Sequence, residues 1–77
     1  MILTTFLLSF LLAQDPVQTA RAQFDDGNYK TALTTLNAAL EKSANNASLH
    51  YWVARTNYEM RNYDEAIKHA EIGRAHV

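Results

Sequence analysis

The sequence predicts an all-α fold in which two antiparallel helix-turn-helix pairs stack as a short α-solenoid. Three observations lead to this prediction. Apolar residues recur at helical spacing, the chain matches itself at an offset of 34 residues, and cap and turn residues separate four helical stretches. No stretch of comparable length alternates polar and apolar residues with the period of two that a strand requires. At 77 residues, the chain is one small domain.

Both helical spacing and self-similarity are visible in the residues themselves. An apolar stripe at steps of four, three and four residues runs through Tyr29, Leu33, Leu36 and Leu40, and again through Leu49, Val53, Thr56 and Met60. Residues of matching size and polarity also recur 34 positions apart. The pairs are Ala20 and Ala54, Arg21 and Arg55, Phe24 and Tyr58, Asn28 and Asn62, Tyr29 and Tyr63, Ala32 and Ala66, and Leu33 and Ile67.

The first segment, residues 1–13, is apolar and uncharged and is followed at once by Gln14, Asp15 and Pro16. A membrane-spanning helix needs about 20 apolar residues, so this run is too short to cross a bilayer. Its length and the small residue Ala13 at its end are typical of a secretory signal, although no Lys or Arg precedes the run. We therefore expect an exported protein, periplasmic or extracellular. If the segment is not cleaved, we expect a membrane-associated N-terminus or a hydrophobic first helix.

Helix start and stop signals place four helices after this segment. Asp15 is a candidate N-cap with Pro16 in the first turn, and Asn62 with Glu65 repeats the capping pattern before the last helix. Tight turns are expected at 26–28 and 60–62, and a polar linker at 43–46. The predicted helices are 16–26, 29–43, 47–60 and 63–71.

Small, aromatic and turn residues recur in both copies of the 34-residue unit. The first copy shows them in Ala20-Arg21-Ala22, Phe24 and 27–33, and the second in Val53-Ala54-Arg55, Tyr58-Glu59-Met60 and 62–67. This frame resembles the tetratricopeptide repeat over about residues 14–71, as two repeats at about 14–46 and 47–71. The chain departs from that family at Ala44, where a proline usually closes a repeat, and at Arg61, where the first copy has Gly27.

The tail, residues 72–77, breaks the repeat pattern. Ala70, Gly73 and Arg74 stand where the first copy has Leu36, Ala39 and Leu40. The tail also resembles the translation of a sequencing-library adapter, so we expect a non-native tail that begins after Glu71 on a longer native protein. The alternative is a short helix end in which Gly73 is the C-cap.

Composition excludes several classes of function. With a net charge of −1, the chain has no strong electrostatic attraction for nucleic acid. The absence of cysteine excludes disulfides, thiolate zinc sites and iron–sulfur clusters. The histidines, His50, His69 and His76, lack the spacing of a metal site, and no nucleophile stands in a Gly-flanked turn. We expect no catalytic site, no cofactor, no metal and no enzyme activity in this chain.

After these exclusions, binding of another protein is the class of function that remains. The resemblance implies that the first helix of each pair lines a groove that holds a peptide or a partner helix. Carried over to this sequence, the peptide-binding groove that the resemblance implies consists of Arg21, Phe24, Tyr51, Trp52, Arg55, Tyr58 and Glu59, with Val17, Asp25 and Ser48 beside them. The competing interpretation is that the aromatic residues are core and that the arginines form a solvated face.

The sequence therefore predicts a non-catalytic protein–protein interaction scaffold whose partner is another protein or peptide. The alternative is the N-terminal repeat module of a longer enzyme or envelope-assembly factor. Because repeats bury their core against their neighbours, the open end of a two-repeat stack is also expected to favour self-association.

Overall fold

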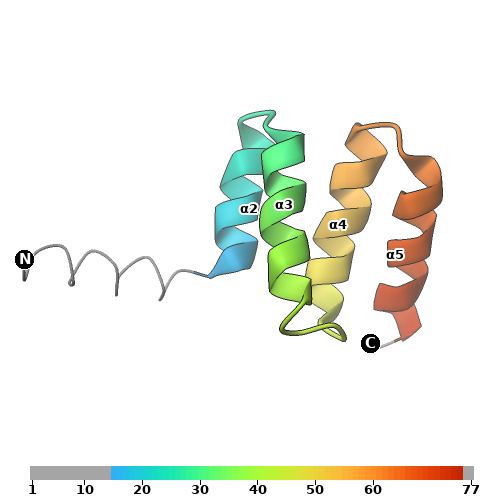
Figure 1. The fold of residues 1–77 in the computed structure, drawn as a ribbon. Coiled ribbons are helices and arrows are strands. Elements are labelled where there is room, and N and C mark those ends of the chain that lie inside the picture. Colours follow the sequence, from blue (N-terminus) through green and yellow to red (C-terminus); the bar gives the residue numbers. More distant parts are fainter. Residues whose placement is uncertain (1–14, 76–77) are drawn as a thin grey trace, which may run out of the picture.

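A computed structural model describes residues 15–75 as four α-helices (Figure 1). They are α2 (Pro16–Asp25), α3 (Tyr29–Leu40), α4 (Ala47–Glu59) and α5 (Tyr63–Ala75). Successive helices run antiparallel and pack side by side in chain order. This arrangement confirms the expected all-α stack of two helix pairs. The predicted signal segment, residues 1–13, lies outside the described residues, as do residues 76–77 of the tail. No helix between residues 15 and 75 is long and apolar enough to cross a membrane.

The start of α2 follows the expected chemistry, and α4 has a cap that the sequence analysis did not name. The Asp15 carboxylate accepts a hydrogen bond from the backbone N–H of Val17 at 2.9 Å, and Pro16 occupies the first turn, where its missing N–H costs nothing. Asn46 caps α4 in the same way, with its side-chain oxygen 3.2 Å from the N–H of Leu49. At the start of α5, by contrast, the Asn62 amide donates to Asn57 Oδ1 at 3.4 Å.

Two predicted helix ends were wrong. The second helix ends at Leu40 and not at residue 43, where the Lys42 N–H bonds the carbonyl of Ala39, only three residues back, and the backbone leaves the helix in a turn. The last helix continues beyond residue 71 to Ala75, so Gly73 is no C-cap. It lies buried inside α5, close to the Ala47 carbonyl and the His50 side chain. The non-native origin of residues 72–77 stays a prediction.

Each helix pair turns through the same backbone motif. In the first pair the N–H of Gly27 donates to Phe24 and the N–H of Asn28 donates to Gln23. The second pair repeats both bonds 34 residues later, from Arg61 and Asn62. This is the hydrogen-bond pattern of a Schellman motif, which places one residue in the left-handed region. The left-handed residues are Gly27 at φ 80° and Arg61 at φ 65°.

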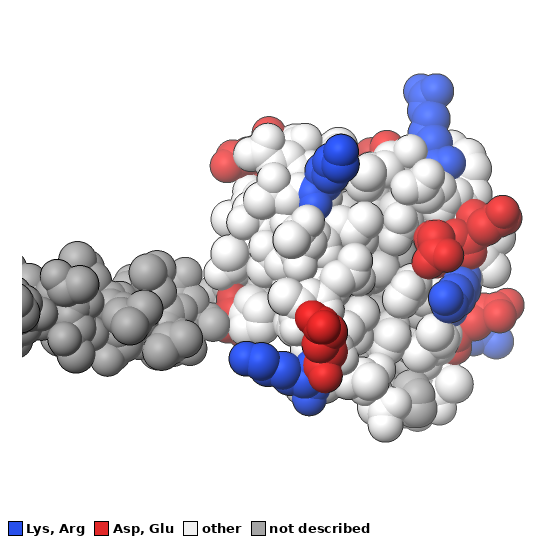
Figure 2. Space-filling model, viewed as in Figure 1, with Lys and Arg blue, Asp and Glu red and all other residues white. Residues whose placement is uncertain are grey.

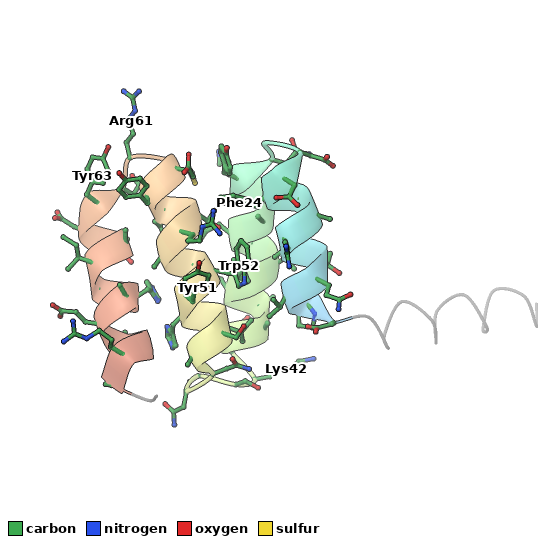
Figure 3. All side chains as sticks on the ribbon, turned by 180° about the vertical axis from the view of Figure 1, so that it is seen from behind. Phe24, Lys42, Tyr51, Trp52, Arg61 and Tyr63 are labelled. Carbon is green, nitrogen blue, oxygen red and sulfur yellow. The ribbon has the colours of Figure 1, made fainter. Side chains whose placement is uncertain are left out.

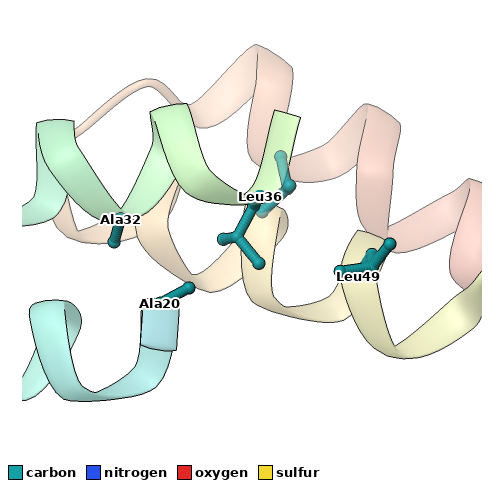
Figure 4. Close-up of a cluster of buried hydrophobic side chains, with 5 residues drawn as sticks. Ala20, Ala32, Leu36 and Leu49 are labelled. Carbon is teal, nitrogen blue, oxygen red and sulfur yellow. The ribbon is translucent and has the colours of Figure 1, made fainter. Parts of the chain in front are cut away.

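The apolar core lies between α2, α3 and α4 (Figure 4). Ala20 and Ala32 let α2 and α3 approach closely, and Leu36, Leu49 and Val53 fill the space where α4 packs on this pair. Each of these side chains is at most 2% exposed. The fourth helix, α5, packs on α4 alone. The first repeat is therefore covered by the second, while the second has no helix of the described chain beyond it.

Candidate functional site

Five of the seven residues predicted for the groove form one cluster across α2 and α4. We call Arg21, Phe24, Tyr51, Trp52 and Arg55 the Arg–aromatic cluster. The first two lie on α2 and the other three on α4, so the cluster spans the two repeats. Figure 3 shows Phe24, Tyr51 and Trp52 on the same side of the molecule, with the Trp52 ring between α4 and α2.

Contacts between rings and guanidinium groups hold this cluster together. The Trp52 ring meets Phe24 edge-on at 5.6 Å and Tyr51 at 5.5 Å between centroids. The Arg55 guanidinium carbon lies 5.0 Å from the Trp52 centroid and 5.1 Å from that of Phe24, and Arg21 lies 5.9 Å from Trp52. Distances below about 6 Å are in the range of cation–π attraction. The two arginines are thus positioned by the rings beneath them.

The residues of the cluster differ in burial. Phe24 and Trp52 are half-buried and pack against the core, whereas Arg21, Tyr51 and Arg55 are exposed. No carboxylate within residues 15–75 pairs with either arginine, since the ion pair found there joins His69 and Glu65. The guanidinium groups therefore keep N–H donors available to a ligand.

The other two predicted groove residues are not part of the ring contacts that define the cluster. Tyr58 meets Tyr63 edge-on at 5.5 Å and lines the groove between α4 and α5, together with Tyr51 and Arg55 of the cluster. Glu59 is exposed on the last turn of α4. Of the three flanking residues, Val17 packs against the core, while Asp25 and Ser48 are exposed. Tyr51 and Arg55 therefore belong both to the cluster with α2 and to the lining of the groove with α5.

A histidine pair that the sequence did not suggest joins α4 to α5. His50 Nδ1 and His69 Nδ1 are 2.9 Å apart, and His50 Nε2 is 2.6 Å from the Ala44 carbonyl oxygen. Since a carbonyl only accepts, His50 Nε2 carries a proton, and in the neutral pair His69 Nδ1 donates to His50 Nδ1. The antiparallel register of the helix pair could have suggested this contact, because both residues lie far from the turn.

The pKa of His69 lies below its ordinary value of 6.5. Burial is the largest cause, because it disfavours the charged ring, and His50 adds to the decrease. Glu65, whose carboxylate is 3.6 Å from His69 Nε2, opposes the decrease, and Lys68 contributes slightly to it. The pair is therefore a structural contact that acid weakens. No group of three or more His, Cys, Asp or Glu within residues 15–75 could hold a metal ion.

Charges on the surface do not gather into a patch of one sign. Figure 2 shows lysine, arginine, aspartate and glutamate intermixed around the edge of one face, with uncharged residues between them. This distribution agrees with the net charge of −1 and gives this face no strong attraction for a polyanion.

Antiparallel helix pairs that repeat every 34 residues, each with a left-handed turn residue, define a tetratricopeptide-type repeat protein. The family model described as anaphase-promoting complex, cyclosome, subunit 3 matches residues 9–71. The chain belongs to this family of tetratricopeptide-like repeat proteins. No curated protein and no solved structure matches the chain significantly.

Proposed function

We propose that the chain is a non-catalytic scaffold that binds a peptide or partner helix on the α2–α4 face. Membership of the repeat family makes it a protein-interaction module. The finer proposal rests on one observation: Arg21 and Arg55, one repeat apart, lie exposed beside aromatic rings and pair with no carboxylate of residues 15–75.

The chemistry of the Arg–aromatic cluster suits a peptide. Each guanidinium offers several N–H donors to side-chain carboxylates or backbone carbonyls. The exposed ring of Tyr51 and the half-buried ring of Trp52 offer apolar area with polar edges, the composition typical of binding hot spots. Because the rings already hold Arg55, binding costs little of its side-chain entropy.

The test is a selection of peptides from a phage-displayed library on the full chain. Trp52 is the only tryptophan, so its fluorescence reports binding at this face directly. We expect Arg55→Ala to weaken a selected peptide by about tenfold or more, the loss of one charge-assisted hydrogen bond.

Arg61→Ala is the matched control. Arg61 lies at the turn between α4 and α5, away from Trp52 (Figure 3), and its replacement should leave affinity unchanged. Selected peptides that bind equally well to the Arg55→Ala and wild-type proteins, with no change in Trp52 fluorescence, would refute the proposal.

A further inference from the structure

A second surface, which adjoins the Arg–aromatic cluster at Tyr51 and Arg55, forms an open apolar groove of about 600 Å³ between α4 and α5. Its lining includes Tyr51, Ala54 and Tyr58 from α4 and Ala66, Ile67 and Ala70 from α5. Three of these side chains are strongly exposed for apolar or aromatic residues: Tyr51 at 53%, Tyr58 at 62% and Ile67 at 59%. Large exposed apolar patches of this kind mark interaction sites.

The same surface exists one repeat earlier, and there it is occupied. Thirty-four residues before each lining residue stand Val17, Ala20, Phe24, Ala32, Leu33 and Leu36. In the first repeat α4 packs on these positions, so that Ala20, Ala32 and Leu36 are buried and the other three are half-buried. The groove is therefore the second repeat's copy of the surface on which α4 packs in the first repeat.

The chemistry of α4 shows what such a surface accepts. Leu49 and Val53 enter the core, and Trp52 covers Phe24 and reaches Arg21. With Thr56, which is fully buried, these residues form a stripe at positions i, i+3, i+4 and i+7 of one helix. In the groove, Tyr58 and Arg55 stand where Phe24 and Arg21 meet Trp52.

We infer that the α4–α5 groove binds an amphipathic helix with an apolar stripe at i, i+3, i+4 and i+7 and an aromatic residue at i+3. That aromatic side chain packs on Tyr58 and Arg55 as Trp52 packs on Phe24 and Arg21. Arginine and histidine line the groove and no carboxylate does, so the flanks of the bound helix carry acidic rather than basic residues.

A second copy of the chain is a poor occupant in head-to-tail stacking. The helix it would present is α2, whose residues at the positions of Leu49, Trp52, Val53 and Thr56 are Asp15, Gln18, Thr19 and Ala22. This face is polar and small, and it cannot fill an apolar groove. The occupant is therefore a helix of α4 type and not the first helix of another copy.

The test uses the full chain and a labelled peptide with the sequence of residues 46–60, which is α4 with its cap. We expect fluorescence anisotropy to show binding, and the same peptide with Val53→Asp, which breaks the stripe, to bind at least about tenfold more weakly because it buries a charge.

Two protein variants locate the bound peptide. Ala70 and Ala38 are both exposed helical alanines, but only Ala70 lines the groove. We expect Ala70→Glu to weaken the peptide by about tenfold or more and Ala38→Glu to change affinity by less than about twofold. Circular dichroism verifies that both variants keep their helices. Arg21 contacts Trp52 and does not line the groove, so Arg21→Ala should leave this binding unchanged while it weakens a peptide bound to the Arg–aromatic cluster, and the two proposals can fail separately.

Three results would overturn the inference. The first is that the peptide fails to bind the folded wild-type chain. The second is that it binds the Ala70→Glu and Ala38→Glu variants equally, which would place it outside the groove, for example on the first repeat, where it would displace α4. The third is a wild-type dimer in sedimentation that becomes monomeric in the Ala70→Glu variant, which makes a second copy the occupant.

Discussion

The two repeats share one residue frame but differ in what covers them. In the first repeat, Leu36 is 1% exposed because α4 lies on it. In the second repeat the equivalent residue is Ala70, which is exposed. One helical turn earlier, Leu33 of the first repeat is half-buried, whereas the equivalent Ile67 of the second repeat is exposed. Burial in this fold is thus decided by the next helix and not by the repeat itself.

The interfaces within the two repeats also differ in polarity. The first pair and α4 enclose alanine, leucine and valine. The interface between α4 and α5 encloses His50 and Asn57, whereas the one polar residue of the α4 stripe that packs on the first repeat is Thr56. Each of these polar groups has a partner: Asn57 donates to the Val53 carbonyl at 3.0 Å, and Thr56 to the Trp52 carbonyl at 2.7 Å. Burial of satisfied polar groups adds specificity, but it adds less stability than apolar burial.

The largest expected effect comes from the covered repeat. Replacement of Leu36 by alanine should cost about 2–4 kcal/mol, because it leaves a cavity among tightly packed neighbours. A core of this size provides only about 3–5 kcal/mol in total, so this substitution should remove most of the stability. Ile67→Ala, on the uncovered repeat, should change stability by less than about 0.5 kcal/mol. Urea denaturation followed by circular dichroism measures both. Equal losses would show that the second repeat is also covered in solution.

Aromatic residues at equivalent positions of the two repeats should show the same contrast in stability, with a smaller difference between them. Phe24 packs against Trp52 and Tyr29, so Phe24→Ala should cost about 1–2 kcal/mol for a half-buried ring. Tyr58, at the same position of the second repeat, is 62% exposed, and its replacement by alanine should cost about 0.5 kcal/mol or less. Thermal melts give the comparison, because 1 kcal/mol shifts the Tm of a domain this small by about 4–8 °C.

At the two turns between the helices of each pair, we expect one substitution to stabilise the protein and the other to destabilise it. Arg61 holds the left-handed conformation that Gly27 adopts without a penalty. Arg61→Gly should therefore stabilise the protein by about 0.5 kcal/mol, the strain relieved less the entropy that glycine loses on folding. Gly27→Ala should destabilise it by about 1 kcal/mol through φ alone, since an added Cβ meets nothing within 4 Å. A destabilised Arg61→Gly variant would mean that the arginine side chain makes a contact in solution that offsets its strain.

The smallest effect expected is the pH dependence of the histidine pair, which lies in the second repeat. The pKa of His69 is lowered in the folded chain, so the unfolded chain binds more protons below pH 6.5. Stability should be complete above about pH 6.5 and should decrease as the pH falls from there toward the lowered pKa. If both rings were charged, the Nδ1–H groups of His50 and His69 would also point at each other across the 2.9 Å contact. Urea melts from pH 8 to 5.5 measure the slope, and His69→Gln should flatten it.

Much of the fold followed from the sequence because its determinants are local. The cap at Asp15, the turns at Gly27 and Arg61 and the apolar stripes each act within a few residues of the chain, and so they predicted four helices and their order. The end of α3 could not be located as well, because the turn bond from the Lys42 N–H to the Ala39 carbonyl is one that a helical pattern does not reveal.

The candidate site was predictable only in part. The 34-residue offset placed Arg21 and Arg55 on equivalent faces, and the structure brings both to Trp52. The same offset could not say that Tyr58 contacts Tyr63, or that His50 meets His69. Such contacts depend on how far each helix is rotated against its neighbour.

The sequence by itself determined the helices, their pairing and the repeat, because propensity, capping and apolar periodicity are properties of neighbouring residues. Only the tertiary structure decided which face of each helix is covered. Residues as similar as Leu33 and Ile67 end in different environments, since burial depends on a helix that belongs to another repeat.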